Sequence, residues 1–131
     1  MFSFHHVGYV VTDLSLSVNG FENLGYVASK TYFDKVQNIK IVVMQNNNDP
    51  MIELILPIED NNPINRFFGK NKSPTPYHVC YSVADISNAS EHLRSQGFIA
   101  TMKASLSVAF DNKPFIFFYG QPTGLIELIE T

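Results

Sequence analysis

Two histidines and two glutamates occupy repeated positions in this chain. His6 and His78 are 72 residues apart, and Glu53 and Glu127 are 74 residues apart. Each glutamate stands in the segment Ile-Glu-Leu-Ile. A carboxylate among apolar residues is costly to bury unless it is solvated, protonated or bound to a cation. Two imidazoles and two carboxylates at equivalent places would form a four-ligand N₂O₂ site for a metal ion.

The repetition extends well beyond these four residues. Moving residues 4–24 along the chain by 72 positions places Tyr9 on Tyr81 and Asp13 on Asp85. A period this long that occurs only twice indicates a duplicated module, whereas a solenoid would need more copies. The chain therefore reads as two copies of one module.

Each copy is expected to contain one helix and several strands. Segments rich in β-branched and aromatic residues favour strands. Asp13 and Asp85 are good N-caps, and Gly25 and Gly97 are good C-terminal ends for the two helices. The expected strands are 4–11, 26–33, 39–45, 51–56, 77–83, 99–102, 114–119 and 124–130, and the expected helices are 13–24 and 85–96, with a helical turn at 63–68. This pattern predicts an α+β fold with two tandem βαβββ modules.

The period of two along a strand decides which side chains share a face. In the first strand, Val7, Tyr9 and Val11 form a bulky apolar face, which is a natural seat for the following helix. His6 then lies on the opposite face, beside the small residue Gly8. In the second copy, His78 lies in the same way beside Cys80. Small neighbours leave room for a bound group at both histidines.

Composition and charge restrict the possible functions. The chain has 131 residues, of which 45% are hydrophobic and 16% charged, as in compact globular domains. The net charge is −3 and basic residues do not cluster, so we expect no nucleic-acid partner. No apolar run is long enough to cross a membrane, and the N-terminus lacks the pattern of a signal peptide. A single cysteine excludes an internal disulfide and favours a cytoplasmic location.

These motifs together resemble the vicinal oxygen chelate superfamily, which includes glyoxalase I, methylmalonyl-CoA epimerases, extradiol dioxygenases and bleomycin resistance proteins. The resemblance rests on HHVGYVV, IELILP, YHVCYSVADI and LIELIE, and it covers nearly the whole chain. It implies one domain over residues 1–131, with modules at about 4–57 and 77–131 and a connection at 58–76. It also implies a curled, barrel-like mixed sheet with the helices outside, wrapped around one divalent metal ion such as Zn, Ni, Co or Mn.

The resemblance implies that His6, Glu53, His78 and Glu127 are the metal ligands. It also implies a metal-dependent isomerase or lyase of the epimerase or glyoxalase I (lactoylglutathione lyase) type, acting next to the carbonyl or thioester of a small substrate. Glu127 or Glu53 would move the proton by loosening from the metal. By family analogy we expect a homodimer.

One feature departs from the epimerase pattern. The resemblance implies a second, non-ligand glutamate just before the third strand, but residues 34–38 read DKVQN. Asp34 is shorter by a methylene, so it is either a substitute base or part of a solvated turn. The two-base mechanism of racemisation depends on which of these holds.

Two other functions are compatible with the same fold. A binding or resistance protein without catalysis is the main alternative, although such relatives lack the ligands that this chain retains. An extradiol dioxygenase would use two histidines and one carboxylate.

Three further residues near the site are not expected to bind the metal. His5 is expected on the face away from His6, His92 on an exposed helix side, and Cys80 as a small residue of the cavity. A CoA substrate would require basic residues near the pocket mouth, for which Lys30, Lys35, Lys40, Arg66, Lys70, Lys72 and Lys113 are available.

Overall fold

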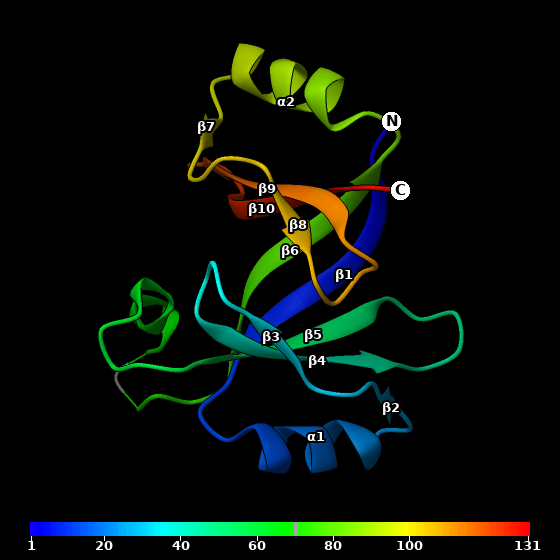
Figure 1. The fold of residues 1–131 in the computed structure, drawn as a ribbon, viewed down its shortest axis with the longest axis vertical. Coiled ribbons are helices and arrows are strands. Elements are labelled where there is room, and N and C mark those ends of the chain that lie inside the picture. Colours follow the sequence, from blue (N-terminus) through cyan, green and yellow to red (C-terminus); the bar gives the residue numbers. More distant parts are fainter. Residues whose placement is uncertain (70) are drawn as a thin grey trace. The chain divides into compact units, whose positions relative to one another are not determined.

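The structure, a computed structural model, describes residues 1–69 and 71–131 (Figure 1). Lys70, one of the basic residues available for a CoA substrate, lies outside the described residues. The elements in chain order are β1 (Ser3–Val10), α1 (Leu14–Glu22), β2 (Val27–Ala28), β3 (Tyr32–Asp34), β4 (Ile39–Gln45), β5 (Met51–Pro57), the 3₁₀ helix η1 (Pro63–Phe67), β6 (Thr75–Val83), α2 (Ile86–Ser95), β7 (Ile99–Ala100), β8 (Ser105–Ser107), β9 (Lys113–Gly120) and β10 (Gly124–Glu130).

The strands form one mixed sheet, which confirms the α+β class. The hydrogen-bonded order is β2-β4-β5-β1-β6-β10-β9-β7, with β3 paired to β4 and β8 paired to β9. β10 runs parallel to β6 and antiparallel to β9. The order has two ends, at the two-residue strands β2 and β7. The prediction of a curled, barrel-like sheet is therefore wrong, because the described strands do not join these ends into a closed ladder.

The described chain divides into two compact units. Unit 1 comprises residues 1–6 and 78–131, and unit 2 comprises residues 7–77. The first six residues thus belong to the same unit as the second sequence module, and both chain ends lie in unit 1 (Figure 1). His6 is the last residue of this N-terminal segment.

In unit 2, α1 packs on the apolar side of the strands through the predicted face. The Asp13 carboxylate accepts a hydrogen bond from the Leu16 N–H at 3.1 Å and so caps the helix. The rings of Tyr9 and Phe21 meet edge to face, with centroids 5.4 Å apart. The remaining contacts of this core come from Val11, Leu14, Val18, Tyr26, Ala28, Val42, Met44, Ile52, Leu54 and Leu56. The helix therefore packs on the side of β1 opposite to Gly8 and Val10.

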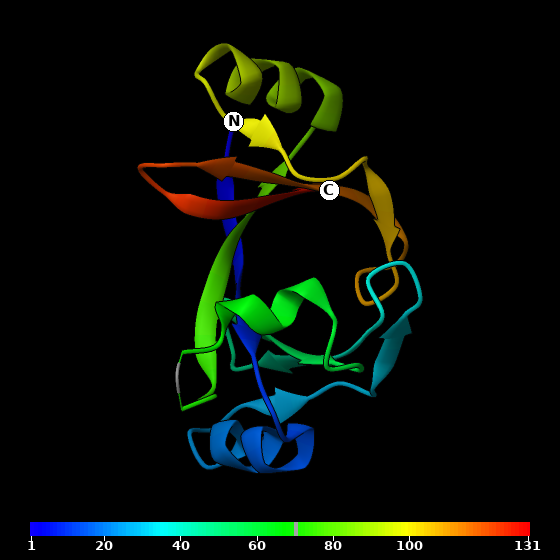
Figure 2. The ribbon, with the colours of Figure 1, turned by 90° about the vertical axis from the view of Figure 1, so that its left-hand side faces the viewer.

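In unit 1, α2 covers one face of β9 and β10 (Figures 1 and 2). The Asp85 carboxylate accepts from the Asn88 N–H at 2.9 Å, and Gly97 follows the helix with φ +91°. Val83, Ala89, Ile116, Phe118 and Leu128 form the buried core below the helix. Cys80, Phe115, Phe117 and Ile129 form a second cluster. Because Ile116 and Phe117 are consecutive in β9, the two clusters lie on opposite faces of the strand.

Two local features differ from the expected strands. The strand expected at 26–33 is split into β2 and β3, because the Ser29 hydroxyl takes over the Val43 N–H at 2.9 Å and interrupts the regular ladder. β8 was not expected, since Ser-Leu-Ser carries little strand signal, and its pairing with β9 holds it in place. Residues 46–50 join β4 to β5, with Asn47 in the left-handed region at φ 51°.

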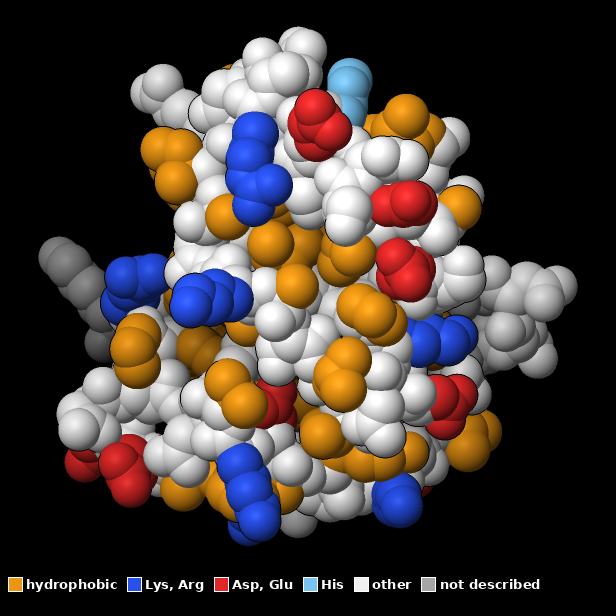
Figure 3. All heavy atoms as spheres, turned by 45° about the horizontal axis from the view of Figure 1, so that its top comes forward, with side chains coloured by type: hydrophobic (Ala, Val, Ile, Leu, Met, Phe, Trp, Pro, Cys, Tyr) orange, Lys and Arg blue, Asp and Glu red, His pale blue; other side chains and the backbone are white. Residues whose placement is uncertain are grey.

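The described surface carries charges of both signs. On the face drawn in Figure 3, Lys and Arg side chains lie among acidic and hydrophobic ones. Within residues 1–69 and 71–131, no helix has the length and apolar character needed to cross a membrane.

Candidate metal centre

Three of the four predicted ligands meet in unit 1. β1 supplies His6, β6 supplies His78 and β10 supplies Glu127. In the parallel pairing of β6 with β10, Glu127 is the register partner of Cys80, and across the antiparallel pair with β9 it is the partner of Phe117. His78 is two residues from Cys80 and therefore shares its face. The sheet itself thus brings His78 and Glu127 to one side, opposite to α2.

The polar atoms of these three side chains converge. His6 Nε2 lies 3.1 Å from His78 Nε2 and 3.1 Å from Glu127 Oε2, and His78 Nε2 lies 2.9 Å from the same oxygen. All three residues are buried, with at most 3% of their surface exposed. Two nitrogens and one oxygen therefore form a compact triangle away from bulk solvent.

This triangle fits a divalent metal ion. Two ligands about 2.1 Å from one ion and at right angles to each other are about 3.0 Å apart, which agrees with the three sides of the triangle. Imidazole nitrogen and carboxylate oxygen are donors that Zn, Ni, Co and Mn accept. The donor set and its spacing support the predicted metal site, although they do not select among these ions.

Glu127 is held in its charged form by the two histidines. Burial alone would raise the pKa of its carboxyl, but hydrogen bonding to His6 and the charge of His6, followed by the same effects of His78, outweigh it and hold the pKa well below its usual range. A carboxylate that stays ionised in a buried place is suited to a cation.

Aromatic rings fix the orientation of both histidines. The Phe110 ring stacks on His6, with centroids 5.1 Å apart and an interplanar angle of 16°. The Phe117 ring meets His78 edge to face at 5.0 Å. Phe117 is therefore next to the site, whereas Tyr119 at the end of the same strand is 48% exposed. Phe110 stands in a loop without strand or helix periodicity, so no sequence signal identifies it.

His5 is the second residue that the sequence did not identify. Its Nδ1 lies 2.8 Å from Nδ1 of His6, so the expectation that it lies away from His6 is wrong. Backbone alternation fixes only the direction of Cβ, and the His5 ring turns back toward its neighbour. When His6 donates its Nδ1–H to His5, the Nε2 lone pair of His6 faces His78 and Glu127, as ligation requires.

The surroundings keep His5 neutral. Desolvation by burial is the main cause that lowers the pKa of His5 to about 4, and the nearby charge of His6 lowers it further. A neutral imidazole has one nitrogen that can accept a hydrogen bond. His5 can therefore act as the acceptor that fixes the His6 tautomer.

The fourth predicted ligand, Glu53, lies in β5 of unit 2. It is buried, with 5% of its surface exposed. Its register partner on β4, Val43, and its neighbour in the chain, Leu54, are also buried. The strand context predicted for it is confirmed, and its ligation remains a prediction.

Asp34, the candidate second base, is engaged in a turn of unit 2. Its Oδ1 accepts the backbone N–H groups of Val36 and Gln37 at 2.9 and 3.0 Å. Its Oδ2 accepts the Gln37 side-chain amide at 3.0 Å. Both carboxylate oxygens are therefore used to close residues 34–37, which favours the turn over the catalytic interpretation.

The remaining candidates lie outside the triangle. His92 is exposed on α2, as expected, and contacts the Phe2 ring. Cys80 is fully buried, and its sulfur lies within 4.8 Å of nitrogen atoms of His5 and His6. Its position agrees with a small residue packed beside the histidines.

The sequence and the fold of this chain are similar to those of known proteins. The sequence matches the glyoxalase/bleomycin resistance protein/dioxygenase superfamily over residues 5–117. The chain belongs to this superfamily. The resemblance inferred from the four motifs is thereby confirmed.

Several members of the superfamily that resemble this chain are methylmalonyl-CoA epimerases. The human mitochondrial methylmalonyl-CoA epimerase is 28% identical over 127 residues, which cover 95% of this chain and 71% of that protein. The epimerase from Mycobacterium tuberculosis has a similar structure, with a TM-score of 0.85 and 25% identity over 97% of this chain and 86% of that one. An epimerase in complex with methylmalonyl-CoA and NH4+ has a TM-score of 0.86 at 16% identity, covering 100% of this chain and 95% of that one.

Proposed function

We propose that this protein is a metal-dependent isomerase or lyase that moves a proton on the carbon next to a carbonyl group. The observation that carries the proposal is the buried triangle of His6, His78 and Glu127. A group of two imidazoles and one ionised carboxylate has little structural purpose in an apolar interior, where apolar side chains would be cheaper to bury. Superfamily membership supports the same conclusion.

Glu53 would supply the fourth ligand, because it occupies in the first module the place that Glu127 occupies in the second. The four residues would then hold one divalent ion through two nitrogens and two carboxylates. The ion would supply Lewis-acid polarisation of the substrate carbonyl, which makes the adjacent carbon–hydrogen bond more acidic.

A carboxylate of the site would then carry the proton. Glu127 or Glu53 accepts the proton from the carbon while the bonding electrons move toward the carbonyl oxygen. The same carboxylate returns the proton to an adjacent position or face, so no net oxidation or reduction occurs. Burial keeps water from competing for the proton during this step.

The structure of Asp34 bears on how many bases take part. Because both of its carboxylate oxygens are hydrogen-bonded in the 34–37 turn, it is poorly placed to act as a second base. This supports a mechanism with one proton-carrying carboxylate, as in the glyoxalase I type. The substrate would be a small molecule with a carbonyl or thioester, and the epimerase relatives favour an acyl-CoA thioester.

Isotope exchange at carbon tests the proposal. The metal-loaded protein is incubated in D₂O with methylmalonyl-CoA and, separately, with the hemithioacetal of methylglyoxal and glutathione. Proton NMR then follows loss of the C2 proton of the first and isomerisation of the second. Turnover of either that disappears after chelation would support the proposal.

The negative outcome is equally specific. A protein that binds metal but turns over neither compound would exclude both named activities. A protein that takes up no Zn, Ni, Co or Mn would instead favour a small-molecule binding or resistance protein of the same fold.

A further inference from the structure

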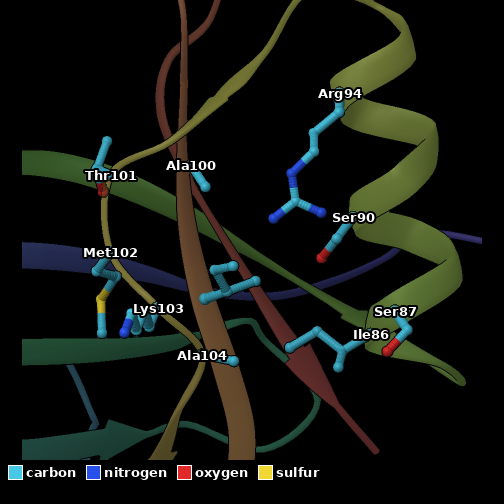
Figure 4. Close-up of a pocket in the computed structure, with 10 residues that line it drawn as sticks. Ile86, Ser87, Ser90, Arg94, Ala100, Thr101, Met102, Lys103 and Ala104 are labelled. Atoms are coloured by element: carbon cyan, nitrogen blue, oxygen red, sulfur yellow. The ribbon is translucent and has the colours of Figure 1, made fainter.

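A cavity in unit 1 lies on the face of the sheet that carries α2, opposite to His78 and Glu127. Its volume is about 660 Å³, which falls in the range of pockets for small molecules. One wall is α2 and the other is the connection from β7 to β8 (Figure 4), and Ile116 of β9 also lines the cavity. Ile116 and Phe117 point to opposite sides of β9, so this cavity is separate from the histidines.

The polar groups of the cavity favour an anion. Arg94 and Ser90 reach from α2 toward the connection that carries Lys103 (Figure 4). Among the described residues, the lining includes two cationic side chains and no carboxylate. The carboxylate of Glu130, near the start of α2, already accepts the Ile86 N–H at 2.9 Å.

Ser90 adds an observation that is independent of charge. Only 5% of the surface of Ser90 is exposed, yet its side chain lines the cavity. Within the part of the chain that the structure describes, its hydroxyl has no hydrogen-bond partner. The hydroxyl is not among the fully buried polar atoms that lack a partner, so it opens onto the cavity, where water or a ligand can form a hydrogen bond with it.

Arg94 is also held ready for a ligand. Its guanidinium carbon lies 5.5 Å above the centre of the Phe118 ring, a cation–π contact that limits the freedom of the side chain. The donors at the edge of the guanidinium remain available, and such a planar fork matches the oxygens of a phosphate or carboxylate.

The first module contains a matching groove, but the described residues that line it include no Lys or Arg. That groove, between α1 and the β2–β3 segment of unit 2, has a volume of about 280 Å³. At the positions 72 residues earlier, Ser90, Arg94 and Lys103 are replaced by Val18, Glu22 and Thr31, respectively. Since both modules build the same strands and helix, the fold does not require a cation at positions 94 and 103 or a hydroxyl at position 90. Their presence in one copy indicates a role specific to that copy.

We propose that the α2 groove, lined by Arg94, Lys103 and Ser90, binds a small metabolite through a phosphate or carboxylate group. The two cations neutralise the oxyanion and the Ser90 hydroxyl donates a hydrogen bond to it. The remaining volume holds the rest of the ligand. This site is additional to the proposed proton-transfer site and does not depend on it.

Titration of the full-length protein with pyrophosphate and, separately, citrate tests the inference. ¹H–¹⁵N NMR spectra should show saturable shifts of amides in α2 and in residues 100–104, and a response to only one probe identifies the anion class. Arg94→Glu and Ser90→Val restore the residues of the first module and should each weaken binding about tenfold or more. Arg66→Glu is the matched control, because Arg66 is also exposed and lies over an aromatic ring, 5.3 Å from the centre of Phe67.

The results separate a built site from general charge attraction. Saturable binding that survives Arg66→Glu but is lost in the two groove variants, with unfolding temperatures near that of the wild type, would support the site. If Ser90→Val does not fold, the surface variant Arg94→Glu alone decides, since it leaves the core intact. Absence of shifts with both probes at millimolar concentration, or equal weakening by Arg66→Glu and Arg94→Glu, would overturn the inference.

Discussion

His6 and His78, 72 positions apart in the chain, face each other through Nε2 atoms separated by 3.1 Å. Two neutral imidazoles can share one proton across such a distance, but Glu127 Oε2 points at the same two nitrogens. Two imidazole nitrogens and one carboxylate oxygen therefore offer three electron-pair donors at one point. A cation at this point would contact all three groups.

Metal content provides the first prediction. Purified protein without an affinity tag should hold about one divalent ion per chain, measured by mass spectrometry of the metal. His78→Ala should lose it, because one of the converging nitrogens is removed. His92→Ala is the matched control, since His92 is exposed on α2 and should leave the metal content unchanged. Equal metal content in both variants would contradict the site.

Replacing each glutamate by glutamine distinguishes the roles of Glu127 and Glu53. Glu127→Gln should retain the fold but slow deuterium exchange at the substrate carbon by roughly 10²-fold or more, as expected when a proton-transfer group is removed. Glu53→Gln should mainly weaken metal binding if Glu127 carries the proton. The opposite pattern would assign the proton to Glu53, and full activity of both variants would exclude a carboxylate base.

His5 should act as a positioning residue for His6. His5→Leu removes the hydrogen-bond acceptor next to His6 Nδ1, so metal affinity should fall about 10- to 100-fold, as is typical when the partner of a ligating histidine is lost. His5→Gln keeps a polar group there and should recover part of the affinity. The measurement is competition with a metal-binding dye. A similar loss in both variants, or in neither, would argue against positioning.

Asp34→Ala distinguishes structure from catalysis. The substitution leaves the Val36 and Gln37 amides without their acceptor, so the free energy of unfolding should fall by about 1–3 kcal/mol. Exchange activity per folded, metal-loaded molecule should remain near the wild-type value. Loss of activity at full metal loading would restore Asp34 as a second base.

Glycine substitutions test the packing of the two units separately. A Cβ at Gly120 would lie 2.4 Å from the Phe98 ring, so Gly120→Ala should lower the free energy of unfolding by about 1–3 kcal/mol. Gly20 is exposed within α1 and has no atom within 4 Å of such a Cβ, so Gly20→Ala should stabilise the protein by up to about 1 kcal/mol. Urea unfolding of both variants provides the comparison, and equal effects of the same sign would contradict this packing.

The sequence predicted the parts of the site that follow from repetition and alternation. His6 and His78 could be identified as equivalent residues because each begins the same motif, His-Val-x-Tyr. Glu127 could be recognised because a carboxylate is unusual between Ile126 and Leu128. The helix caps at Asp13 and Asp85 follow from local chemistry, and both are confirmed.

Other features depend on contacts that a linear pattern does not contain. The His5 ring is turned by a rotamer, and Phe110 reaches His6 from a loop. The use of Asp34 in a turn depends on amides two and three residues later. Whether a sheet closes depends on pairing between its edge strands, and β2 and β7 each have only two residues with which to pair. These properties arise from three-dimensional arrangement more than from residue type.

The assignment of residues 1–6 to the same unit as residues 78–131 has a consequence for biosynthesis. Unit 2 is continuous in the chain and can fold while translation proceeds. His6, in contrast, is made 121 residues before Glu127. At about 5–20 residues per second, roughly 6–24 s separate the two on the ribosome. The triangle of His6, His78 and Glu127 therefore cannot form on a nascent chain that stops short of β10, and an ion bound by all three residues would have to enter after β10 is made.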